Sequence, residues 1–195
     1  MNKVSARSTV GRPRDENADN AILTTTYNHL IQYGYSRMSI EGIAAAAGVG
    51  KATIYRRFAN KQELAAAAII NGEPVDRITG VDDVRTAIGK IFSLLSHAMF
   101  EKRAVRVIGS LLAEEVNDPE LLAVFRERVI GPRRLIIRGI LERGIAAGEI
   151  RSDLDIDIAI DMMLGSVLGR YLAGITAEPD WADKVLDGFW RMIST

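Results

Sequence analysis

Apolar residues recur at spacings of three and four along nearly the whole chain, and this spacing is typical of amphipathic α-helices. Short stretches rich in Gly, Pro, Asp and Asn interrupt the pattern. The pattern predicts helices at residues 15–33, 40–47, 51–58, 61–71, 82–101, 104–116, 118–147, 155–173 and 180–193. The chain is therefore predicted to be all-α, with about nine helices.

Local signals mark where some of these helices begin or bend. Ser39 and Asp82 each precede a helical pattern and are expected to act as N-caps. Pro132 lies inside the 118–147 pattern, where it lacks an N–H and crowds the carbonyl of Arg128. A kink or break is therefore expected at this proline.

Residues 39–61 carry the most specific pattern in the chain. Ile40, Ile43 and Ala44 line one face of a short helix, and the small Ala44 lets a second helix cross closely. Gly48 then permits a tight turn, because glycine adopts positive φ without a Cβ penalty. The pattern thus predicts two short helices joined by a sharp turn.

The second of these helices presents a basic face. Ile54 and Phe58 are four residues apart and are expected to face inward. Gly50 is a candidate N-cap for it, and Asn60 can cap the helix that follows. The residues left on the outer side are Lys51, Ala52, Thr53, Arg56 and Arg57. This arrangement predicts a helix-turn-helix, which places its second helix in the DNA major groove.

In these residues the chain resembles the TetR/AcrR family of bacterial transcriptional regulators. The resemblance is closest over residues 22–64, and a weaker one covers the turn at residues 142–155. Gly50 departs from the serine that is usual in the family. The matching segments are Gly34-Tyr35, Ser39-Ile40-Glu41-Gly42-Ile43-Ala44, the run from Ala47 to Phe58, and Asn60-Lys61-Gln62-Glu63-Leu64.

The resemblance implies an N-terminal helix-turn-helix domain followed by a larger helical domain for effector binding and dimerisation. It implies that Tyr55 and Lys61 contact phosphate. Arg56 is the best candidate for reading a base, because its guanidinium can bond guanine O6 and N7 together. The implied DNA-binding residues in the folded domain are Arg37, Ser39, Gly50, Lys51, Ala52, Thr53, Tyr55, Arg56, Arg57 and Lys61.

The distribution of charge agrees with a DNA-binding N-terminal half. The 195 residues have a formal net charge of zero. Residues 1–71 nevertheless hold nine Lys and Arg against five Asp and Glu, a net charge of +4, and residues 72–195 carry −4. Such asymmetry suggests that one half meets a polyanion, although a swing of this size also arises by chance in two-domain proteins.

The first residues form a basic segment that contains Arg12 and Arg14. Such a segment either reaches into a narrow minor groove or remains a solvated tail. We therefore divide the chain into a basic disordered arm at residues 1–14, a helix-turn-helix domain at 15–72, and a helical effector-binding and dimerisation domain at 81–195.

Composition narrows the class of protein further. The chain has no Cys, which excludes disulfides and thiolate metal sites and fits a reducing cytoplasm. The sequence contains no run of about 18 apolar residues, so we expect no membrane span. The polar, basic first residues do not form a secretory signal. We therefore expect a cytoplasmic protein.

The last two predicted helices are rich in large apolar residues, which fit either core burial or half of a four-helix dimer interface. The family pattern favours the interface, and a two-fold dimer can read a palindromic site. The predicted interface residues are Met162, Leu164, Val167, Leu168, Tyr171, Leu186, Phe189, Trp190 and Ile193.

The larger domain also contains residues that fit either a closed core or a cavity for a small apolar or amphipathic effector. Methionine suits such a cavity because its side chain repacks easily. The predicted lining residues are Phe92, Leu95, Met99, Leu111, Leu112, Phe125 and Met163.

The main rival is an enzyme or a helical small-molecule-binding protein without DNA binding. The chain has two histidines, His29 and His97, and no nucleophile motif or cofactor loop. The carboxylates of Glu114, Glu115 and Asp118 are more simply a solvated face than a metal site. We therefore expect no catalytic residue, cofactor or metal, and a dimeric repressor that a small molecule releases from a palindromic operator. Activation instead of repression stays open.

Overall fold

The structure is a computed structural model that describes residues 16–72, 83–100 and 103–195 except residue 177. The regular elements among these residues are all helices, and β-pairing is confined to an isolated bridge between Ile150 and Ser194. The helices are α1 Glu16–Tyr33, α2 Ile40–Ala46, α3 Lys51–Tyr55, α4 Lys61–Gly72, α5 Val84–Phe100, α6 Arg103–Ala113, α7 Pro119–Phe125, the π-helical segment η2 Arg126–Ile130, α8 Gly131–Ala146, α9 Ile156–Leu172 and α10 Trp181–Ile193. Counted with α7, η2 and α8 as one continuous helix, the described residues form nine, and the all-α prediction is confirmed.

Short-range polar contacts begin the helices largely where the sequence predicts. Ser39 Oγ accepts the N–H of Gly42 at 3.1 Å, which caps α2. Asn60 Oδ1 accepts the N–H of Glu63 at 2.8 Å, at the start of α4. Asp82 lies outside the described residues, and Asp83 caps α5 by accepting the N–H of Thr86 at 3.1 Å. Each carboxylate, amide or hydroxyl satisfies an N–H that the helix itself leaves unpaired.

Of the kink or break predicted at Pro132, the break is wrong, because the chain stays helical through it, and the local distortion takes the form of a π-helical segment. The N–H of Gly131 bonds the carbonyl of Arg126, five residues back, where an α-helix would use four. This wider π-helical turn inserts an extra residue just before the proline, and such insertions occur as single-turn features within α-helices.

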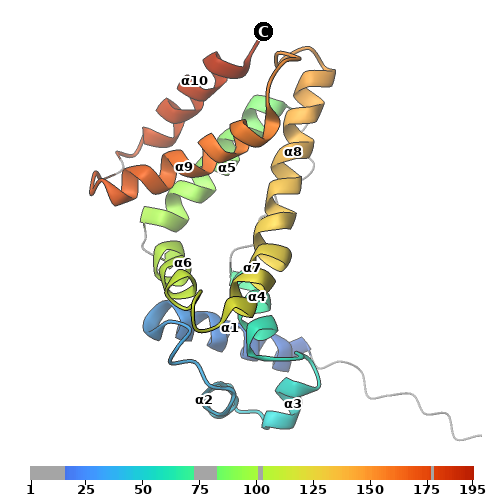
Figure 1. The fold of residues 1–195 in the computed structure, drawn as a ribbon, viewed down its shortest axis with the longest axis vertical. Helices are drawn as coiled ribbons and strands as arrows, with labels where there is room; N and C mark the ends of the chain where they lie inside the picture. The colour runs from blue at the N-terminus through green and yellow to red at the C-terminus, as the bar shows by residue number, and fades with distance from the viewer. Residues whose placement is uncertain (1–15, 73–82, 101–102, 177) are drawn as a thin grey trace, which may run out of the picture.

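The helices enclose two hydrophobic cores, one in the lower half of Figure 1 and one in the upper half. The lower core contains residues of α1 to α4 and also Val107, Leu111 and Leu121 of α6 and α7. The upper core is built from α5, α8, α9 and α10. The core around the helix-turn-helix therefore extends into α6 and α7, beyond the residue 72 limit predicted from the sequence.

Within the described residues, no helix is both long and apolar enough to cross a membrane.

Candidate nucleic-acid interface and adjoining cavity

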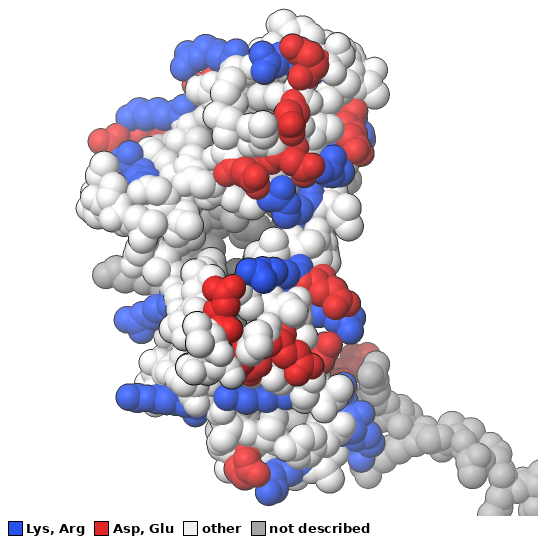
Figure 2. All heavy atoms as spheres, viewed as in Figure 1, with Lys and Arg blue, Asp and Glu red and all other residues white. Residues whose placement is uncertain are grey.

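The turn between α2 and α3 has the geometry that the sequence predicts. Gly48 has φ +68°, in the left-handed region that favours glycine. Ile43, Ala44 and Ile54 are buried between the helices, so the opposite side of α3 is held outward. Figure 2 shows Lys and Arg side chains around the lower end of the molecule, where α2 and α3 lie in Figure 1.

Most of the predicted contact residues lie on this outward side. Tyr55, a large aromatic residue, is 56% exposed. Arg56 is exposed, and its side chain makes no hydrogen bond or ion pair with any described residue. Thr53 is half-buried. The other predicted positions that are exposed are Arg37, Ser39, Gly50, Lys51 and Ala52.

Lys51 is already paired within the chain. Its Nζ lies 2.9 Å from Oε1 of Glu41 on α2. The hydrogen bond between them raises the pKa of Lys51 and lowers the pKa of Glu41, and both side chains are exposed. A phosphate at this point would therefore compete with Glu41 for the ammonium group.

The placement of Arg57 on the outer side is wrong. Its side chain is 8% exposed, and its Nε donates to the carboxylate of Asp19 on α1. Its Nη1 also donates to the carbonyl of Thr53 at 3.1 Å. Arg57 lies two residues beyond Tyr55, the last residue of α3, and turns inward, so its charge pairs with α1 and does not face outward.

Lys61 is half-buried at the start of α4, with its Nζ 4.0 Å above the ring of Tyr35. Burial lowers the pKa of Lys61. The neighbouring Gln62 donates to both carboxylate oxygens of Asp118, at 3.3 and 3.1 Å. A phosphate contact by Lys61 stays a prediction, because its present partner is the face of an aromatic ring.

Two predicted contact residues, Arg12 and Arg14, lie outside the described residues together with the rest of the basic arm at residues 1–14.

A cavity of about 190 Å³ lies between the two cores. Leu95, Met99 and Phe125 line it, as predicted from the sequence. Its wall is formed by Ile69, Leu95, Ala98, Met99, Val107, Ile108, Phe125, Ile130, Arg133, Arg134, Ile137, Leu164, Val167 and Leu168.

The other four predicted lining residues are wrong. Phe92 and Met163 are fully buried in the upper core, where Phe92 packs edge-on against Phe189. Leu111 is buried in the lower core, and Leu112 on the same helix is 55% exposed to solvent. The apolar spacing identifies an inward face but does not tell which inward residues meet a void.

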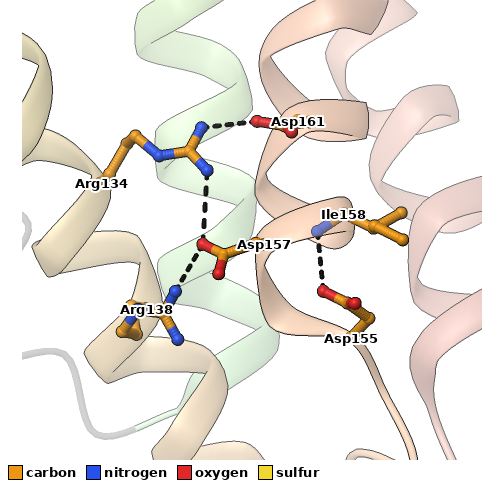
Figure 3. A network of polar contacts seen from close by, with 6 residues as sticks. All are labelled: Arg134, Arg138, Asp155, Asp157, Ile158 and Asp161. Carbon is orange, nitrogen blue, oxygen red and sulfur yellow. Dashed lines mark hydrogen bonds and ion pairs between the residues drawn. The ribbon is translucent and has the colours of Figure 1, made fainter.

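Arg134 connects the cavity wall to α9 (Figure 3). Its Nη1 lies 2.5 Å from Oδ1 of Asp161, and its Nη2 lies 3.4 Å from Oδ1 of Asp157. Arg138 pairs with the same carboxylate of Asp157. The sequence analysis missed these arginines, because nothing local in the sequence pairs residues of α8 with residues of α9.

The predicted dimer surface divides into buried and exposed positions. Val167, Phe189 and Ile193 are buried inside one chain, so their assignment to a surface is wrong. Met162 and Leu168 are 47% and 40% exposed. Leu164, Tyr171, Leu186 and Trp190 are half-buried. The sequence analysis missed the exposed apolar side chains Ile158, Leu172 and Ile175 on or just after α9.

Comparison with known proteins places this geometry in a family. A family model described as bacterial regulatory proteins, tetR family, matches residues 22–68, and a tetracyclin repressor-like C-terminal domain matches residues 79–189. The HTH-type transcriptional regulator YdeS of Bacillus subtilis (strain 168) is 34% identical over 186 residues, which cover 93% of this chain and 88% of the relative.

Two further comparisons agree. The DNA-binding transcriptional repressor TetR of Mycobacteroides abscessus is 25% identical over 180 residues, covering 89% of this chain and 92% of that protein. A TetR-family transcriptional regulator from Rhodococcus sp. has the same fold, with a TM-score of 0.73 at 20% identity, covering 92% of this chain and 100% of that one. The chain therefore belongs to the TetR family of bacterial regulatory proteins and is a DNA-binding transcriptional regulator.

Proposed function

We propose that the protein represses transcription as a homodimer on a palindromic operator and is released when a small apolar or amphipathic effector enters the cavity. The observation that carries the proposal is the outward side of α3, where Tyr55 and Arg56 are exposed above the buried Ile54. A tyrosine hydroxyl and a guanidinium held on a packed helix suit phosphate and guanine respectively.

The exposed apolar side chains of α9 support the second copy. Met162, Leu168 and Leu172 are 47%, 40% and 73% exposed on α9, which lies between α10 and α8 in the view of Figure 1. Side chains of this size bury well against an identical surface related by a two-fold axis. Such a dimer would present its two α3 helices to half-sites about 34–36 Å apart.

The cavity wall supports control by an effector. Ile69 belongs to α4 of the helix-turn-helix region, and Phe125 ends α7, whose other end contacts the same region through Asp118. A ligand that binds better to a state with differently spaced α3 helices lowers DNA affinity by its differential affinity for the two states.

Selection of genomic fragments tests the DNA-binding part of the proposal. Purified full-length protein should recover fragments that share an inverted repeat, with binding that weakens as salt rises. The Arg56→Ala variant should lose preference among these fragments, whereas Arg151→Ala, an equal charge loss on the exposed turn before α9, should retain it. Recovery of fragments without an inverted repeat would contradict a palindromic operator, and absence of DNA binding would favour a small-molecule-binding protein.

Light scattering tests the dimer. The wild-type protein should have the mass of two chains, and Leu172→Asp should shift it toward one chain. Leu135→Asp is the matched control, because Leu135 is 67% exposed on α8 outside the proposed surface. An unchanged mass for Leu172→Asp, or an equal loss in the control, would remove α9 from the interface.

A further inference from the structure

The cavity wall combines apolar side chains with two adjacent cations. Apart from Arg133 and Arg134 on α8, every described side chain that lines it is aliphatic, aromatic or methionine. No carboxylate or neutral polar side chain is present among the described lining residues. A cavity of this kind matches a molecule with an apolar body and a single polar end, since an unpaired polar group against the apolar wall would be costly.

The sign of the charge on that polar end follows from the arginines. A guanidinium carries its positive charge at any physiological pH and offers a planar fork of N–H donors that fits carboxylate and phosphate oxygens. A cationic ligand would meet two like charges and no carboxylate in the wall. The two arginines therefore favour an anionic ligand over a cationic one.

Arg134 is positioned by contacts that an anion would replace. The side chain of Arg134 is 30% exposed, and its guanidinium reaches Asp161 and Asp157, which are exposed on α9 (Figure 3). Asp157 also pairs with Arg138, so Asp157 keeps a partner if Arg134 turns away. An anion in the cavity would therefore compete with α9 for Arg134, and this competition would loosen one tie between α8 and α9.

We propose that the cavity binds amphipathic anions, with an alkyl body along the apolar wall and a carboxylate or phosphate head held by Arg133 and Arg134. This proposal deepens the effector role proposed above, and it rests on that role only for its biological meaning. Ligand binding to the full-length protein in the absence of DNA tests the proposal. The ligand proposal can therefore fail while DNA binding is confirmed, and DNA binding can fail while the ligand proposal is confirmed.

Isothermal titration with three probes of one chain length provides the test. Decanoate and decyl phosphate carry the two kinds of anionic head, and decan-1-ol carries a neutral head on the same chain; all are used below their micellar concentrations. Both anions, or one of them, should bind about tenfold or more tightly than the alcohol, as expected for charge-assisted hydrogen bonds. The anion that binds identifies the head group.

Variants of α8 separate specific contact from general charge. Arg133→Gln and Arg134→Gln should each reduce anion affinity toward that of the alcohol and leave alcohol binding unchanged. Arg138→Gln is the matched control. Arg138 lies one turn after Arg134 on α8 and outside the cavity wall, and the variant removes the same charge. Arg134→Lys, which keeps the charge without the fork, should give an intermediate loss and serves if the glutamine variant does not fold.

Several outcomes would overturn the proposal: equal binding of anion and alcohol, no binding of either anion, anion preference that survives both glutamine variants, or a loss in Arg138→Gln as large as in Arg134→Gln.

Discussion

The hydroxyl of Tyr35 donates a hydrogen bond to Oδ2 of Asp118 at 3.1 Å, across 83 positions of sequence. Tyr35 lies in the loop between α1 and α2, and Asp118 precedes α7. Asp118 also accepts the N–H of Leu121 at 3.0 Å, which caps α7. Because α7 ends at Phe125 in the cavity wall, one carboxylate connects the helix-turn-helix region to a helix that reaches the cavity.

The Tyr35→Phe variant removes this hydrogen bond and keeps the ring beneath Lys61. We expect a loss of about 1 kcal/mol in the free energy of unfolding, because Asp118 keeps its other donors and is not left unpaired. Asp118→Ala also loses the helix cap and should cost about 2 kcal/mol or more. Urea unfolding measures both, and the double variant should lose less than the two single losses combined. Strict additivity would show that the two residues do not interact.

Arg56 and Arg57 are adjacent in sequence, but substitution of Arg57 should affect stability, whereas substitution of Arg56 should affect DNA binding. Arg57→Ala should lower the free energy of unfolding by about 1–3 kcal/mol, because it leaves the half-buried Asp19 without its cation. Arg56→Ala should change stability by less than about 0.5 kcal/mol and should instead alter DNA preference. Unfolding curves and competition between DNA sequences measure the two effects. Equal stability losses would contradict the inward placement of Arg57.

The contrast between these two arginines shows what sequence could and could not predict. Helix ranges and the Ser39 and Asn60 caps depend on neighbours within a few residues, so local patterns predict them. Arg57 and Asp118 take partners 38 and 83 positions away, which no local pattern specifies. The cavity could not be predicted for the same reason, because its wall combines residues from six helices and η2 that are far apart in sequence.

The division between core and surface could be predicted only in part. The apolar residues of α9 and α10 recur on helical spacing whether they meet their own chain or a second copy. Val167 on α9 and Ile193 on α10 are buried, whereas Leu168 and Leu172 on α9 are exposed. Their spacing in sequence is the same as in any amphipathic helix, so only the packing of α5 and α8 on one side of α9 distinguishes them.

Gly48 and Gly50 differ in backbone conformation and provide a matched pair. A Cβ on either would meet no atom within 4 Å. Gly48 has φ +68°, whereas Gly50, the N-cap of α3, has φ −77°. Gly48→Ser should therefore cost about 1 kcal/mol, and Gly50→Ser should stabilise by about 0.5–1 kcal/mol through a stiffer unfolded chain and a better cap. Thermal unfolding measures both; stabilisation by Gly48→Ser would contradict the turn geometry.

His29 should make stability depend on pH. Burial, together with the charge of Lys61, lowers its pKa, and its Nδ1 has no hydrogen-bond partner among the described residues. Because the folded pKa lies below the unfolded value of about 6.5, the contribution of His29 to stability is complete above that pH. It is lost as the pH falls through the folded pKa.

The His29→Phe variant should therefore lose less stability than the wild type between about pH 7.5 and pH 5. Phenylalanine keeps a ring against Tyr33, whose ring centroid lies 4.9 Å from that of His29. Chemical unfolding at each pH compares the wild type with His29→Phe. Parallel pH dependence of wild type and His29→Phe would mean that His29 is not the group that titrates.

Glu41 places a negative charge on the proposed DNA-binding surface, where it pairs with Lys51. Glu41→Gln should release that ammonium for phosphate and remove a repulsive charge. We expect tighter binding to both operator and unrelated DNA, and a salt dependence steeper by up to about one counterion. Glu149→Gln, an equal charge change on the exposed turn after α8, should leave both quantities unchanged. If Glu41→Gln binds DNA as the wild type does at every salt concentration, Lys51 does not contact phosphate, and the interface is confined to Tyr55, Arg56 and their neighbours.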